Sequence, residues 1–159
     1  MPCRAMRSAA DVAGLLQRMR SPEGEQLVFE QNFFIETFVP TSIIRSLSEE
    51  EMEAYRRPFR EPRSRTPTLA WPRELPIEGE PQDVAEIVRR YGGWLAESPL
   101  PKLLVKAEPG AFLVGRAYEF CRSWPDQDEA SVSGIHFVQE DSPDEIGASL
   151  REFSSVVEW

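Results

Sequence analysis

The sequence is poor in residues on which several classes of function depend. Its 159 residues include one histidine and two cysteines, Cys3 and Cys121, and its 18 Lys and Arg are outnumbered by 27 Asp and Glu. The formal charge of −9 argues against binding to nucleic acids, because a surface for the phosphate backbone needs an excess of basic side chains. A single histidine also excludes a zinc site built from several imidazoles, and we expect no metal.

Long apolar runs are missing as well. No stretch approaches the roughly 20 apolar residues that cross a bilayer, so we expect no membrane association. Asp11 interrupts the weakly apolar N-terminal stretch, which we interpret as an amphipathic helix rather than a signal peptide. The cysteines form no C-x-x-C motif and no disulfide framework, which favours a reducing compartment. The expected location is the cytoplasm, and the periplasm stays open.

What is present indicates a folded protein with an interrupted middle. Hydrophobic residues make up 41% of the chain, with 9 Phe, 4 Trp and 3 Tyr, and the length suffices to bury a core. Most of the 14 prolines lie between residues 40 and 110. They predict short helices separated by breaks.

The first half of the chain predicts helices and loops. Apolar residues at helical spacing predict a helix over 9–20, and Ser21-Pro22 ends it while opening the next. The aromatic stretch Gln31 to Val39 is ambiguous, and Pro40 is expected to close it. Ser48 to Glu51 form a capping box, which predicts a helix that Pro58 stops.

The rest of the chain changes character near residue 98. Residues 58–81 are expected to form a proline-spaced connector with little regular structure, followed by a helix to about Glu97. Four further elements are then predicted: strand 102–107, helix 117–122, strand 128–132, and a helix to about Val157 opened by a capping box at Ser142 to Glu145. Two parallel strands cannot bury both faces alone, so we expect further strands outside these residues.

His136 is the candidate catalytic residue. It follows the second predicted strand, and the carboxyl ends of strands are where open α/β sheets carry out chemistry. Its ordinary pKa suits a general base near neutral pH. A lone loop histidine is more often structural, and the sequence contains neither G-x-S-x-G nor G-x-D-x-G to supply a nucleophile.

Four segments closely resemble haloalkane dehalogenases, especially the subgroup of hexachlorocyclohexane-degrading enzymes. They are LSEEEMEAYRRPF (47–59), PTLAWPRELPIEGEP (67–81), WLAESPLPKLL (94–104) and HFVQEDSPDEIG (136–147). The likeness is dense from about Met19 to Ile146. It implies an α/β fold: a partial α/β-hydrolase, with a helical cap (lid) domain over residues 1–78 and the last two parallel strands and helices of the core over 79–159.

The resemblance also implies a reaction. An aspartate displaces halide from a small halogenated hydrocarbon, and a water activated by histidine then hydrolyses the resulting ester. The reaction uses no metal or organic cofactor. His136 matches the catalytic base. The positions that match pocket residues are Phe34, Phe38, Trp71, Pro72, Leu75, Ala111 and Phe112. Without the resemblance, ordinary core packing would explain these aromatic residues.

Several family features have no counterpart in the 159 residues. The nucleophilic Asp, the Trp after it and the halide-binding Asn precede this region in the family, and Met1-Pro2 match a pair that follows the catalytic acid. Glu108 lies near an alternative acid position, although a loop carboxylate is the simpler interpretation. We therefore expect the chain to be inactive alone and to need a complementary N-terminal half. A non-catalytic fragment or ligand-binding module, and another hydrolase such as an epoxide hydrolase, stay open.

Overall fold

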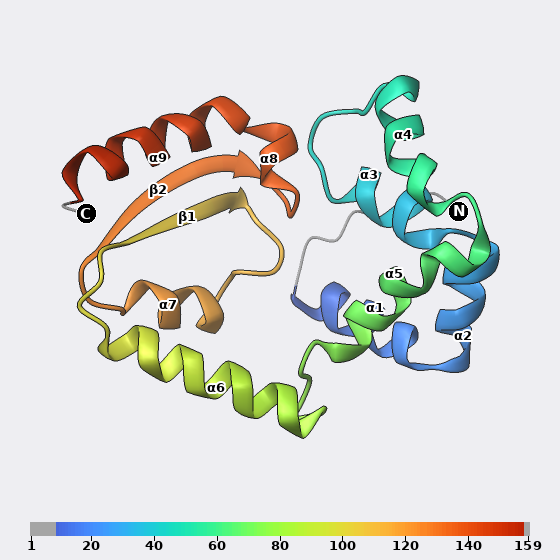
Figure 1. Cartoon of the computed structure of the whole chain (residues 1–159), viewed down its shortest axis with the longest axis horizontal. Helices are drawn as coiled ribbons and strands as arrows, with labels where there is room; N and C mark the ends of the chain where they lie inside the picture. Colours follow the sequence, from blue (N-terminus) through green and yellow to red (C-terminus); the bar gives the residue numbers. More distant parts are fainter. Residues whose placement is uncertain (1–8, 158–159) are drawn as a thin grey trace.

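The chain forms two parts that lie side by side (Figure 1). The computed structural model describes residues 9–157, so the predictions that concern Met1-Pro2 and Cys3 lie outside the described residues. The first part holds α1 (Ala9–Arg20), α2 (Pro22–Glu25), η1 (Gln26–Glu30), η2 (Phe34–Phe38), α3 (Val39–Thr41), α4 (Glu49–Arg56), η3 (Arg57–Phe59), η4 (Pro62–Arg65) and α5 (Thr66–Glu74). The second holds α6 (Gln82–Glu97), β1 (Lys102–Pro109), α7 (Arg116–Arg122), β2 (Gln127–Gly134), α8 (Val138–Asp141) and α9 (Pro143–Val156).

The first part is a helical layer with its own core. Met19, Leu27, Val28 and Leu69 form one buried cluster, which joins α1 to η1 and α5. Ile35, Val39, Ile43 and Met52 form another beneath α4. The helix predicted over 9–20 is confirmed, as is the start of the next helix at Pro22.

The aromatic stretch whose periodicity was ambiguous is helical. Residues Phe34–Phe38 form a π-helical turn that continues directly into α3. The prediction that Pro40 closes this segment is wrong, because Pro40 lies in the first turn of α3 and the helix runs on to Thr41. Pro40 therefore lies inside one continuous helical run over residues 33–41, where it removes one backbone hydrogen bond of the helix without ending it.

The predicted capping box at the start of α4 is confirmed. The Ser48 hydroxyl accepts from the Glu51 N–H at 3.2 Å, and the Glu51 carboxylate accepts from the Ser48 N–H at 2.7 Å. The α-helix ends at Arg56, and Pro58 lies in the 3₁₀ turn that follows.

The prediction of an irregular connector over 58–81 is wrong for most of its length. A 3₁₀ turn and the nine-residue helix α5 occupy residues 62–74, with Pro72 inside the helix. Thr68, Leu69 and Pro72 are buried on one face of α5. Burial against α1 and η1 compensates for the hydrogen bond that Pro72 cannot make.

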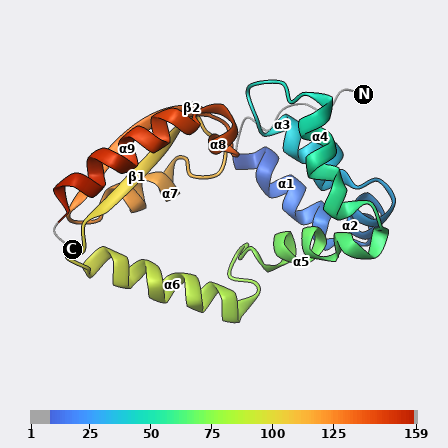
Figure 2. The ribbon, with the colours of Figure 1, turned by 45° about the horizontal axis from the view of Figure 1, so that its top comes forward.

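The second part is built on two parallel strands. β1 pairs with β2 in the register Val105 to Ala130, so the predicted pairing is confirmed and each strand is longer than expected. The helices predicted before, between and after the strands are present as α6, α7 and α9. In Figures 1 and 2, α9 lies along one side of the strand pair, and α6 and α7 lie on the other.

The second predicted capping box is wrong, although the helix it announced is present. The Ser142 side chain makes no capping hydrogen bond to α9. Its hydroxyl donates instead to the carbonyl of Ser133 at 2.9 Å, near the end of β2. The Ser142 backbone, with φ −137° and ψ 51°, is outside the extended conformation in which a capping hydroxyl meets the first N–H groups of a helix.

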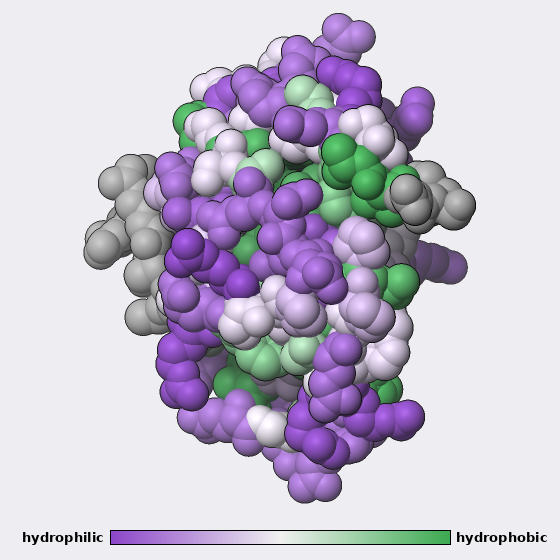
Figure 3. Space-filling view, turned by 90° about the vertical axis from the view of Figure 1, so that its left-hand side faces the viewer, coloured by the Kyte–Doolittle hydropathy of each residue, from purple (hydrophilic) through white to green (hydrophobic). Residues whose placement is uncertain are grey.

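The second part leaves apolar side chains exposed. α6 exposes Ile87, Tyr91 and Trp94, each with more than half of its surface accessible, and Phe120 on α7 is equally exposed. Figure 3, which views the strand end of the molecule, shows hydrophobic patches that interrupt a hydrophilic surface. Across residues 9–157, no helix combines the length and the apolar character that a membrane crossing requires.

Candidate active site

An apolar cavity lies where the two parts meet. It has a volume of about 250 Å³ and is walled by α1, the segment around η2, α5 and two loops of the second part. The residues that line it are Leu15, Leu16, Met19, Phe33, Phe34, Phe38, Trp71, Pro72, Leu75, Phe112 and His136. Among the described residues, His136 is the one ionisable side chain in this lining.

The loop after β2 delivers His136 to the cavity. The strand ends at Gly134, and the His136 N–H donates to the Ser42 carbonyl at 3.1 Å. The imidazole stacks on the Phe112 ring, with 4.1 Å between centroids, and meets the edge of Phe38 at 5.7 Å. Two aromatic rings from different parts of the chain thereby fix the plane of the histidine.

The surroundings of His136 favour its neutral form. Burial lowers its pKa from the ordinary value of 6.5, because the charged imidazolium loses its hydration among aromatic side chains. No side chain that the structure describes forms a hydrogen bond with the ring nitrogens. The neutral imidazole that results near pH 7 can accept a proton, as a general base must.

The structure brings most of the predicted site residues together. Seven of them line the cavity: Phe34, Phe38, Trp71, Pro72, Leu75, Phe112 and His136. Ala111 is not part of the lining, although it is buried beside Phe112. Trp71 lines the cavity and still has 59% of its surface exposed, which places it on the rim. The roles of these residues remain predictions.

The sequence analysis missed four lining residues: Leu15, Leu16, Met19 and Phe33. The first three were interpreted only as the apolar face of the first helix. The sequence feature that could have indicated their role is the width of the apolar face of this helix. Leu15 and Leu16 are adjacent, so they point in different directions and cannot both pack into the same narrow contact.

Glu108, the alternative acid position, is not among the residues that line the cavity. It is exposed near the end of β1, and its carboxylate accepts from the Lys106 ammonium at 2.8 Å. This supports its interpretation as a surface carboxylate.

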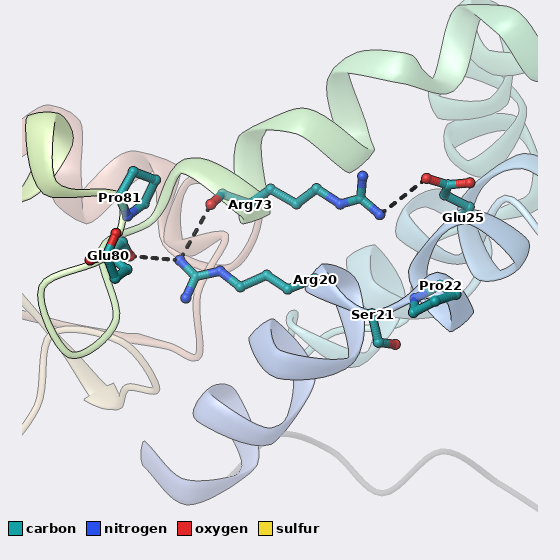
Figure 4. A pocket seen from close by; sticks show the side chains of 7 residues that line it. All are labelled: Arg20, Ser21, Pro22, Glu25, Arg73, Glu80 and Pro81. Carbon is teal, nitrogen blue, oxygen red and sulfur yellow. Dashed lines mark hydrogen bonds and ion pairs between the residues drawn. The ribbon is translucent and has the colours of Figure 1, made fainter.

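A second pocket, of about 570 Å³, lies beside the segment that joins the two parts (Figure 4). Arg20 donates there to the carbonyls of Arg73 and Glu80 at 3.3 and 3.2 Å, and Arg73 reaches the Glu25 carboxylate at 3.5 Å. Arg20 thus ties the end of α1 to the joining segment, and Arg73 ties α5 to α2. No group of three or more His, Cys, Asp or Glu within the described range could hold a metal ion.

Comparisons with known proteins identify relatives. A haloalkane dehalogenase of Sphingobium indicum is 56% identical over 140 residues, which is 87% of this chain and 47% of that protein. One from Mycolicibacterium smegmatis is 47% identical over 145 residues, or 90% of this chain and 47% of that protein. Coelenterazine h 2-monooxygenase of Renilla reniformis is 42% identical over 146 residues, again 90% and 47%. No family model matches the chain.

Solved structures agree with the sequence relatives. DbjA, in a deletion mutant, superimposes with a TM-score of 0.85 at 41% identity, over 93% of this chain and 53% of that one. The haloalkane dehalogenase DatA of Agrobacterium tumefaciens superimposes with a TM-score of 0.84 at 30% identity, over 95% and 53%.

The fold of this chain is therefore that of an α/β-hydrolase, and it corresponds to about half of each of these solved structures. Within that class the chain belongs with the haloalkane dehalogenases, to which it is homologous over most of its length. It spans about half the length of the curated relatives it matches.

Proposed function

We propose that this chain supplies the cap and the general base for the hydrolysis of carbon–halogen bonds in small halogenated hydrocarbons. The observation that carries the proposal is the position of His136, whose ring reaches an apolar cavity of about 250 Å³ lined by both parts of the chain. Such a cavity suits a small apolar substrate, and a neutral base at its wall suits a water-dependent step.

The proposed chemistry has two steps. An aspartate attacks the halogen-bearing carbon, and halide leaves with the bonding electron pair as an alkyl ester forms. His136 then takes a proton from a water, whose oxygen attacks the ester carbonyl. Collapse of the intermediate releases the alcohol, regenerates the aspartate and returns the proton. The two products are the alcohol and the halide, and the dry aromatic wall strengthens the electrostatic interactions at the reacting atoms.

The 159 residues contain no G-x-D-x-G segment to provide that aspartate. We therefore propose that the chain alone is inactive and that a complementary N-terminal half completes the site. The boundary of the proposed cap stays near residue 78, where Ile77 and Glu80 pair across a tight turn between α5 and α6.

Halide release tests this proposal. The chain alone should release no halide from short haloalkanes. Co-expression with the N-terminal half of the Sphingobium relative should restore turnover, because the missing groups act as a unit and their loss costs several orders of magnitude in rate. Turnover by the unaided chain would overturn the proposal.

A His136→Ala variant tests the role of the base in the reconstituted enzyme. Alkylation of the aspartate does not require the base, so one equivalent of halide should appear before the reaction stops with the ester intact. The parent should turn over continuously. Sustained turnover by the variant would remove His136 from the mechanism.

Specific observations bear on two other functions, a ligand-binding module and epoxide hydrolysis. The 42% identity to a coelenterazine monooxygenase means that likeness over this region does not by itself fix the reaction. A ligand-binding module would retain apolar ligands in the cavity and gain no turnover from any N-terminal half. Epoxide hydrolysis needs lid tyrosine donors, but the Tyr55 hydroxyl donates to Glu140 and is not among the cavity-lining groups.

A further inference from the structure

Two loops of different parts of the chain exchange hydrogen bonds behind the histidine. The Ser42 carbonyl, just after α3, accepts from the N–H groups of His136 and Phe137 at 3.1 and 3.3 Å. In return, the Asp141 carboxylate accepts from the N–H groups of Ile44 and Arg45 at 2.9 and 3.0 Å. We call these contacts between residues 42–45 and 136–141 the histidine latch.

A charged layer covers the latch. Arg45 donates to the Glu140 carbonyl at 2.7 Å and to the Glu140 carboxylate at 2.6 Å. The same guanidinium reaches Glu51 in α4 at 2.8 Å, and the Tyr55 hydroxyl donates to Glu140 from the same helix. One exposed ion pair contributes little, but a guanidinium fork shared by a carbonyl and two carboxylates holds a defined geometry.

Phe137 secures the latch on its inner side. It packs against the cluster of Ile35, Val39, Ile43 and Met52, and its ring lies 5.7 Å from that of Phe38. The residue next to His136 is thus anchored in the core of the first part, whereas the strand that leads to His136 belongs to the second.

We propose that Asp141 and Arg45 are positioning residues that fix the His136 ring in the cavity by holding its loop against residues 42–45. Asp141 offers charged acceptors to two successive N–H groups, which no neutral side chain of similar size does as strongly. That the latch positions a catalytic base rests on the proposed function. That the latch positions the ring does not depend on it.

Nuclear magnetic resonance of the imidazole tests the latch, because the chain has one histidine and hence one set of ring signals. Stacking on Phe112 should shift these signals upfield. In Asp141→Leu the upfield shift and the cross-relaxation to Phe112 should be lost. Asp141→Asn keeps one oxygen that both N–H groups can use, so it should recover most of the shift. Asp144→Leu is the matched control, an exposed carboxylate three residues away that should change neither signal.

Modification of His136 by diethyl pyrocarbonate gives a second readout that tolerates self-association. Its rate should rise in Asp141→Leu and stay at the parent value in Asp144→Leu. An unchanged ring environment in a folded Asp141→Leu protein, or an equal change in the control, overturns the proposal. If Asp141→Leu fails to fold, Arg45→Gln decides: displacement of the ring supports the latch, and an unmoved ring contradicts it.

The two proposals fail separately. If halide release cannot be restored but the ring moves in Asp141→Leu, the proposed function falls and the latch stands. If turnover is restored, and Asp141→Leu changes neither the turnover nor the position of the ring, the proposed function stands and the latch falls.

Discussion

At the residue scale, two fully buried side chains of the first part differ in what they contribute. Ile35 is 1% exposed and sits within an apolar cluster. Ser42 is 0% exposed, yet its hydroxyl has no hydrogen-bond partner among the described residues. Its contribution to the histidine latch comes from the backbone carbonyl alone, which any residue would provide.

Alanine substitutions should therefore have opposite effects at these positions. Ser42→Ala removes a buried hydroxyl without a partner and should be neutral or stabilise by up to about 1 kcal/mol. Ile35→Ala leaves a cavity and should lower the free energy of unfolding by about 2–5 kcal/mol. Chemical denaturation of both variants measures the difference. A large loss of stability in Ser42→Ala would mean that the hydroxyl has a partner in solution.

His136 should also make stability depend on pH. Burial lowers the pKa of its imidazole, so the unfolded chain takes up the proton more readily than the folded chain. The contribution of the neutral ring is complete above about pH 6.5 and is lost as the pH falls through the lower, folded pKa. The thermal midpoint of the parent should fall more steeply over this range than that of His136→Gln. Parallel curves would contradict the burial of the ring.

At the scale of elements, the start of α4 depends on one reciprocal cap. Ser48→Ala removes the acceptor for the Glu51 N–H and should cost about 1 kcal/mol. Ser48→Asp keeps an acceptor at the same position and should retain most of the stability. Urea denaturation of the three proteins measures the effect. Equal stability of the parent and Ser48→Ala would mean that packing of Met52 alone holds the helix.

Elements with a local cause were predictable from the sequence, and elements decided by distant contacts were not. The cap at Ser48 involves residues that are three positions apart in the sequence. β1 is predicted by an apolar run between prolines. α5 was missed because Pro72 suggests a break, whereas its helix is held by burial against α1 and by the bond from Arg73 Nε to the Met19 carbonyl. The cap predicted at Ser142 failed because its backbone, at φ −137° and ψ 51°, lacks the extended conformation of an N-cap.

The candidate site divides in the same way. The resemblance to a family predicted seven of the lining residues. It could do so because residues at matching positions of related sequences occupy the same place in the fold. Composition and spacing alone selected His136, the end-of-strand histidine, and gave no reason to join it to Trp71 or Leu75. The latch was invisible in the sequence, since Asp141 bonds to backbone groups, which every residue has.

At the scale of the whole molecule, β1 pairs within the described residues with β2 alone, which leaves its other edge free, and the second part has uncovered apolar faces. β1 carries the apolar sequence of a central strand, whereas its partner β2 carries Asp128 and Glu129 as edge strands do. The sequence of β2 is therefore that of a strand whose outer edge faces solvent. The sequence of β1 is that of a strand whose other edge pairs with a further strand.

The isolated chain should therefore associate with itself or precipitate. Unpaired N–H and C=O groups along an apolar edge recruit other strands. Sedimentation velocity over a range of concentrations should show oligomers whose size grows with concentration, and the complementary half should convert them to a one-to-one complex. A concentration-independent monomer with one sharp thermal transition would contradict this expectation.

The histidine latch has a consequence for how the chain acquires its structure. Asp141 and Ile44 are separated by 97 residues, whereas the helices on either side form from neighbours. Contacts across so long a loop must await its closure, so we expect the latch to form late in folding. During synthesis at about 5–20 residues per second, the first part, which ends with α5 at Glu74, would wait roughly 3–13 s before Asp141 is made. During that interval the aromatic residues that the first part contributes around His136 have been made, but His136 has not. A chaperone that binds apolar surfaces can bind these residues during that time.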